Sequence, residues 1–128
     1  MANELIGVEI EQRDGVVIVA RLAGELDISV AESTGRKIAQ ALPSSARGVV
    51  VDTTGLEFMD SSGVSMLFNL ARQVASHRQQ LRVVAPAGKP VARVLQIVEF
   101  ERAAPVHEDV ESAVAEIATP QASQPPGE

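Results

Sequence analysis

The sequence has no cysteine, tryptophan or tyrosine, and it has only three phenylalanines among 128 residues. The absence of cysteine excludes disulfides, thiolate metal sites and cysteine nucleophiles, and it fits a reducing compartment. The scarcity of aromatic rings argues against recognition of nucleic acid by base stacking. Because hydrophobic residues still make up 45% of the chain, we expect an aliphatic core of Val, Leu, Ile and Ala.

The chain also lacks excess positive charge and long apolar runs. Its 17 acidic and 11 basic residues give a formal charge of −6, which disfavours a phosphate backbone and suits a basic protein surface. No apolar run approaches the roughly 20 residues of a membrane span. The start, MANELIGVEI, has neither the basic segment nor the apolar block of a signal peptide. We therefore expect a cytoplasmic protein that binds neither nucleic acid nor membranes directly.

The length predicts one domain, over residues 1–118. The last residues, TPQASQPPGE, contain three prolines and no large apolar side chain, so burial cannot offset the entropy cost of ordering them. We predict that residues 119–128 form a disordered tail.

Strand and helix patterns alternate along the domain. Residues 5–11 and 15–22 are β-rich and flank Asp14-Gly15, which predicts a hairpin. Residues 29–42 have helical spacing, with Asp27 or Ser29 as the expected cap. Residues 48–52 are an uninterrupted apolar run ending in aspartate, which is typical of a buried strand, and residues 53–59 are expected to form a loop.

The second half continues the alternation. A helix after Asp60 is expected to bury Val64, Leu67, Phe68, Ala71, Val74 and Ala75. A strand is predicted over 81–85, a helix over about 89–97 with Pro90 in its first turn, and a last helix over about 108–118. The fold class is therefore α/β: a mixed, mostly parallel sheet of four or five strands, with an antiparallel edge hairpin and about four helices. The junctions at 24–29 and 57–63 should lie side by side at the strand ends.

The segment EFMDSSGVSMLFNL, residues 57–70, contains the most unusual junction. Asp60 is a natural N-cap for the Ser62 and Gly63 N–H groups, which places Ser61 at the first helical position with its hydroxyl toward solvent. Gly63 is unfavourable inside a helix unless another group approaches closely. Met59 and Phe58 form either a staple or an exposed apolar contact. Two interpretations stay open: a plain helix cap, or a hydroxyl that is modified or bound.

A phosphate on Ser61 would add about −1.5 to −2 charges. The helix N-terminus tolerates such a charge, so the fold should survive. A partner packed over the same position would bury an unpaired dianion, and a hundredfold loss of affinity requires only about 2.7 kcal/mol. The motif therefore suits a switch that acts on binding.

Residues 49–52 (VVVD) followed by 56–63 (LEFMDSSG), with 22–27 (LAGELD) upstream, closely resemble the signature of the STAS-domain anti-sigma factor antagonists of bacteria. The resemblance covers roughly residues 5 to 117. It implies a protein that binds an anti-sigma factor with serine kinase activity and so frees a sigma factor. The kinase ends binding by phosphorylating the first hydroxyl of the motif, and a serine phosphatase restores it.

Carried over by position, the resemblance makes Ser61 the phosphoacceptor. The partner-binding residues are then Asp27, Met59, Asp60, Ser61, Ser62, Gly63 and Ser65, although many relatives have a small residue, often glycine, at the position of Ser65. The resemblance implies no cofactor, and we expect a monomer or weak dimer.

An enzyme is the first alternative, with Ser61 as nucleophile and His77 or His107 as base. His77 lies roughly 24 Å along the same helix at 1.5 Å per residue, and His107 follows Pro105 without an orienting motif. We expect both histidines at the surface and no catalysis.

Two further alternatives involve binding. Asp27, Asp52 and Asp60 at strand ends could hold Mg²⁺, but no lysine stands at a later strand end as in receiver domains, and neither histidine has metal-ligand spacing, so we expect no metal. A STAS module that acts as a scaffold or nucleotide sensor without phosphorylation stays open.

Overall fold

A five-stranded sheet organises residues 6–119, the part of the chain that this computed structural model describes. The strands are β1 (Ile6–Arg13), β2 (Val17–Leu26), β3 (Gly48–Met59), β4 (Gln80–Val84) and β5 (Val106–His107), and they lie in chain order across the sheet. β1 pairs antiparallel with β2, and all later pairings are parallel. The predicted α/β class with one antiparallel edge hairpin is confirmed. Residues 120–128 of the predicted tail lie outside the described residues.

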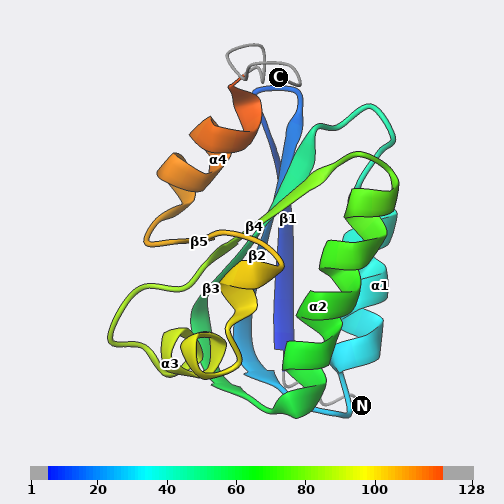
Figure 1. The fold of residues 1–128 in the computed structure, drawn as a ribbon. Coiled ribbons are helices and arrows are strands. Elements are labelled where there is room, and N and C mark those ends of the chain that lie inside the picture. Colours follow the sequence, from blue (N-terminus) through cyan, green and yellow to red (C-terminus); the bar gives the residue numbers. More distant parts are fainter. Residues whose placement is uncertain (1–5, 120–128) are drawn as a thin grey trace.

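The helices divide between the two faces of the sheet. α1 (Ala31–Ala41), α2 (Ser61–Ser76) and α3 (Pro90–Ile97) contribute to the larger core, and a 3₁₀ turn, η1 (Phe100–Arg102), follows α3. α4 (Val110–Ala118) covers the other face with a smaller apolar cluster. Figure 1 shows α1 and α2 side by side across the sheet from α4.

Burial on both faces explains the apolar sequence of the central strands. On β2, Ile18 and Leu22 face the larger core, whereas Val17 and Val19 face α4. A strand that is covered on both faces has no need of polar alternation. The hairpin turn before it forms at Asp14-Gly15 as predicted, with φ of 53° and 71° at these two residues.

The central strands are longer than the sequence pattern predicted. β3 continues through residues 53–59, which were expected to form a loop, and β2 continues to Leu26, beyond the predicted strand end at residue 22. The two extensions pair with each other through register shifts between Arg21 and Ala23 and between Gly24 and Glu25. The loop prediction for 53–59 is therefore wrong. The register shifts interrupt the period-two pattern by which a strand is recognised in sequence.

Two details of the helices also differ. The N-cap of α1 is Val30, without a side-chain hydrogen bond, so the prediction of Asp27 or Ser29 as cap is wrong. On α2, Ala75 is exposed, and Val64 and Phe68 are only partly buried. The buried stripe of α2 is Gly63, Met66, Leu67, Leu70, Ala71 and Val74.

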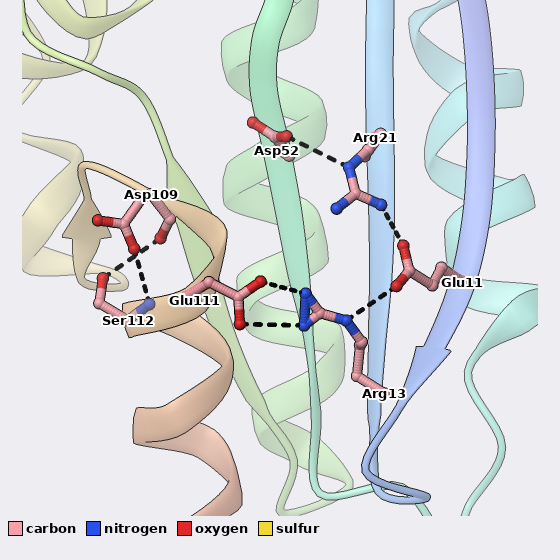
Figure 2. Close-up of polar contacts among 7 residues, drawn as sticks. All are labelled: Glu11, Arg13, Arg21, Asp52, Asp109, Glu111 and Ser112. Atoms are coloured by element: carbon pink, nitrogen blue, oxygen red, sulfur yellow. Dashed lines mark hydrogen bonds and ion pairs between the residues drawn. The ribbon is translucent and has the colours of Figure 1, made fainter.

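A polar network connects the sheet to α4 (Figure 2). Arg13 pairs with Glu11 on β1 and with Glu111 on α4, where Nη2 lies 2.5 Å from Oε2. Arg21 on β2 donates to Glu11, and its Nε lies 3.8 Å from Asp52 Oδ2 on β3. The hydrogen bond from Arg21 holds the pKa of Glu11 below its ordinary value. These pairs lie on the α4 face, away from the junction at Asp60.

No helix within residues 6–119 has the length and apolarity needed to cross a membrane.

Candidate functional site

The β2–α1 and β3–α2 junctions meet at one end of the sheet, as the sequence predicted. Leu26 and Met59, the last residues of β2 and β3, are register partners. The Asp60 N–H then donates to the Leu26 carbonyl over 3.3 Å. Parallel strands thus bring segments about 30 positions apart in the chain into contact.

Asp60 caps α2, and Ser61 is the first helical residue. Asp60 Oδ1 accepts hydrogen bonds from the Ser62 N–H at 2.9 Å and from the Gly63 N–H at 3.4 Å. Two of the unpaired donors at the helix start are thereby satisfied. Ser61 is exposed, and its hydroxyl has no part in the cap. The predicted cap and the predicted exposure of Ser61 are both confirmed.

Gly63 is required by close packing beneath the helix start. A Cβ at this position would lie 2.5 Å from Met59 Cγ and 3.0 Å from both Cγ and Cδ2 of Leu26. Met59 is only 7% exposed, whereas its neighbour Phe58 is 47% exposed. Met59 and Gly63 therefore support the junction from inside, and a partner contact at Met59 stays a prediction that its low exposure does not favour. Phe58 is the exposed apolar side chain of this pair.

Asp27 lies on the neighbouring junction and organises it. Its Oδ1 accepts the Ser29 N–H at 3.0 Å and the Ser29 hydroxyl at 2.6 Å. This local turn uses the carboxylate that was expected to cap α1. The hydrogen bond from the Ser29 side chain is the main reason that the pKa of Asp27 lies below its ordinary value. Asp27 is thus held ionised beside the start of α2.

A groove of about 730 Å³ runs between α1 and α2 and ends at Ser61. Ser61, Ser62 and Ser65 line it from α2, and Ile28, which is 78% exposed, lies at its border. Glu32 and Arg36 line it from α1 and face each other, with 4.0 Å between Oε2 and Nη1. Sequence reasoning missed this groove. α1 and α2 pack closely at Gly35, because a Cβ at this position would lie 2.8 Å from Met66 Cγ.

The two histidines lie apart from Ser61. His77 is exposed at the C-cap of α2, where Nδ1 lies 3.0 Å from the Gln73 carbonyl oxygen. His107 is part of β5 and its side chain is only 14% exposed, so the prediction that it lies at the surface is wrong. Its Nδ1 lies 3.2 Å from Ser112 Oγ. Neither ring can act as a base for Ser61.

The aspartates that were considered as a Mg²⁺ site, and not expected to be one, have other contacts. Asp52 lies within β3, where Oδ1 accepts the Thr54 N–H at 3.0 Å and the Thr54 hydroxyl at 2.6 Å. Asp27 and Asp60 accept bonds from their own junctions, as described above. Within residues 6–119, no group of three or more His, Cys, Asp or Glu side chains is arranged to hold a metal ion.

Comparison with known proteins agrees with this geometry. The family model of the STAS domain matches residues 7–113. The anti-sigma F factor antagonist of Paenibacillus polymyxa is 26% identical over 111 residues, which are 86% of this chain and 93% of that protein.

Two solved structures have the same fold at low identity. An anti-sigma factor antagonist from Mycobacterium paratuberculosis superposes with a TM-score of 0.79 at 22% identity, covering 89% of this chain and 95% of that chain. The Bacillus cell fate determinant SpoIIAA in its phosphorylated form gives a TM-score of 0.67 at 23% identity, over 87% and 99% of the two chains. With the family model matching most of its length, the chain belongs to the STAS domain family, and these relatives are anti-sigma factor antagonists.

Proposed function

We propose that this protein is a phospho-switched regulator that binds an anti-sigma factor when Ser61 is unmodified, and that this binding frees a sigma factor for transcription. Phosphorylation of Ser61 ends the interaction. The observation that carries the proposal is the exposed Ser61 hydroxyl at the first position of α2, beside a cap that Asp60 completes without it.

The covalent step is a phosphoryl transfer from ATP. A serine kinase, proposed to be the anti-sigma factor itself, transfers the γ-phosphoryl group to Ser61 Oγ. ADP leaves, and the hydroxyl proton is released to a base on the kinase. A serine phosphatase reverses the state by hydrolysing the phosphate ester. In this scheme the protein is a substrate and binding partner in the cytoplasm, with no catalytic role and no cofactor of its own.

The relatives support this proposal. The Paenibacillus polymyxa relative is an antagonist of an anti-sigma F factor, and SpoIIAA has been solved in unphosphorylated and phosphorylated forms. The same fold in both forms agrees with a switch that leaves the domain intact. Losing a hundredfold in affinity requires about 2.7 kcal/mol, which an unpaired buried charge readily supplies.

The proposed binding surface surrounds Ser61. Asp27, Asp60, Ser62 and Ser65 are at least partly accessible there. Phe58 and Ile28 add exposed apolar area at its border. Because the carboxylates of Asp27 and Asp60 bring negative charge to this end of the sheet, a basic surface on the anti-sigma factor is the expected complement.

Substitution of Ser61 tests the proposal. Ser61→Ala should bind the anti-sigma factor as the unmodified protein does, and Ser61→Asp should bind at least tenfold more weakly in calorimetry. Asp109→Asn is a control variant, because Asp109 lies at the N-cap of α4, on the other face of the sheet. Equal binding by Ser61→Ala and Ser61→Asp would favour a scaffold that does not respond to phosphorylation.

Phosphate mapping tests the site directly. After incubation with the kinase and ATP, mass spectrometry should place one phosphate on Ser61. Ser62 is the adjacent hydroxyl and is less exposed than Ser61. A phosphate found on Ser62 alone would therefore contradict the assignment.

A further inference from the structure

The charges in the α1–α2 groove are unevenly placed with respect to Ser61. Among the described residues that line the groove, Arg36 is the only cation and Glu32 the only carboxylate. Both belong to α1, and Ser61 lies across the groove at the start of α2. Neither the cap nor the contacts of Asp27 involve Arg36. The contacts that build the junction therefore do not use the Arg36 side chain.

The packing of the two helices brings Arg36 toward Ser61. α1 and α2 lie side by side (Figure 1), and Gly35 packs at the level of Met66. Ser61 is five residues before Met66, which is roughly 7.5 Å along the helix at 1.5 Å per residue. Long helical side chains lean toward the helix N-terminus. The Arg36 guanidinium follows this rule, because its partner Glu32 is one turn nearer the N-terminus.

The present partner of Arg36 holds it loosely. The Arg36–Glu32 distance of 4.0 Å is at the limit for an ion pair, and the side chains are 56% and 89% exposed. Such a pair contributes little to stability, so exchanging it costs little. A phosphate offers more charge and three acceptor oxygens, which match the fork of a guanidinium.

A phosphate on Ser61 lacks other obvious partners at the helix start. The Ser62 and Gly63 N–H groups already donate to Asp60. The nearest organised side chains, Asp60 and Asp27, carry negative charge. A dianion placed there gains most by pairing with the exposed cation that already lines the same groove.

We propose that Arg36 binds the phosphate on Ser61 within the same molecule, leaving Glu32 and closing the end of the groove. This inference rests on the proposed phosphorylation of Ser61. It adds a second element to the switch. The single positive charge of Arg36 does not fully neutralise a phosphate of about −1.5 to −2, so a docked partner would still bury net negative charge, and it would also meet an arginine drawn across the groove mouth. Glu32 then competes with the phosphate for Arg36 in the modified state.

A phosphorus NMR titration tests this pairing without any kinase. The full chain is produced with phosphoserine installed at position 61 during synthesis, and the apparent pKa of the phosphate is measured. A nearby cation favours the dianion, so Arg36→Gln should raise this pKa by about 0.5 units, the shift expected of an exposed ion pair. Glu32→Gln should lower it, because the competitor is removed and a negative charge is lost.

Lys37→Gln is the matched control. Lys37 is the next residue on α1, is exposed and does not line the groove, so its substitution removes the same charge from a position about 100° around the helix. The inference is overturned if Arg36→Gln shifts the phosphate pKa no more than Lys37→Gln does. Thermal unfolding checks that the variants, all at exposed positions, are folded.

The two proposals can fail separately. If the anti-sigma factor binds Ser61→Ala and Ser61→Asp alike, the proposed function fails, although the titration still reports on Arg36. If binding responds to Ser61 and the phosphate pKa ignores Arg36, only the intramolecular pairing is wrong.

Discussion

Replacing Gly63 with alanine tests how tightly the junction beneath Ser61 is packed. In an exposed helix, this change stabilises by about 1 kcal/mol because alanine has the higher helix propensity. Here the added methyl group would lie 2.5 Å from Met59 Cγ and 3.0 Å from two atoms of Leu26. Leu26 is fully buried between the sheet and α2, so it cannot move aside freely.

The two effects have opposite signs, and the packing effect should be the larger. Overpacking a well-filled core costs about 1–3 kcal/mol. Three contacts at or below 3.0 Å, two of them with a fully buried side chain, place Gly63→Ala in the upper part of that range. After the propensity gain is subtracted, we expect a net loss of about 1–2 kcal/mol in the free energy of unfolding.

Urea denaturation measures this loss, and thermal unfolding should show a fall of several degrees in Tm. Ser65→Ala is the control, because Ser65 is exposed on the same helix and should show only the small propensity gain. In a Met59→Ala background, which removes the closest contact, Gly63→Ala should cost at least about 0.5 kcal/mol less. If Gly63→Ala stabilises the wild-type domain, the packing explanation for this glycine is refuted.

Three further predictions concern polar contacts. Asp60→Ala should lower the free energy of unfolding by about 1 kcal/mol in urea denaturation, and Asp60→Asn by only a few tenths; equal losses would contradict the cap. Because the pKa of Asp27 is lowered from 3.8, its hydrogen bonds stabilise the fold above that pH and are lost as pH falls through the lowered pKa. Ser29→Ala should raise the pKa of Asp27 in an NMR titration, and an unchanged value would refute the assigned cause. Glu111→Gln should destabilise by less than about 1 kcal/mol, and a loss that persists in 1 M salt would show that its pairing with Arg13 is not the cause.

The start of α2 could be predicted from sequence because its determinants are local. Asp60, Ser61 and Gly63 are neighbours, and a cap requires only that a carboxylate precede two free N–H groups. The hairpin is similar, since Asp14 and Gly15 adopt positive φ within one turn. In both cases a few consecutive residues determine the conformation.

The ends of β2 and β3 could not be predicted in the same way. Residues 53–59 form a strand because they pair with residues 23–26, and that pairing depends on contacts between distant segments. β5 contains only Val106 and His107, too few residues for a pattern, and it forms by pairing with Val83 and Val84.

The groove beside Ser61 depends on tertiary packing. Its walls belong to α1 and α2, and the sequence alone does not say how these helices rotate against each other. On α2, Met66 and Leu70 are buried although they were not predicted to be, and Ala75, which was predicted to be buried, is exposed. The buried face of α2 is thus rotated from the predicted one. The presence of Arg36 and Ser61 in one groove follows from this rotation.

The most direct test compares the unmodified protein with the form phosphorylated on Ser61 in two measurements on the same samples. Our proposal predicts that the free energy of unfolding changes by less than about 1 kcal/mol, since the modified oxygen is exposed at a helix start. It predicts that affinity for the anti-sigma factor falls at least a hundredfold, or about 2.7 kcal/mol. A phosphorylated protein that unfolds, or one that stays folded and binds as tightly as before, would contradict it.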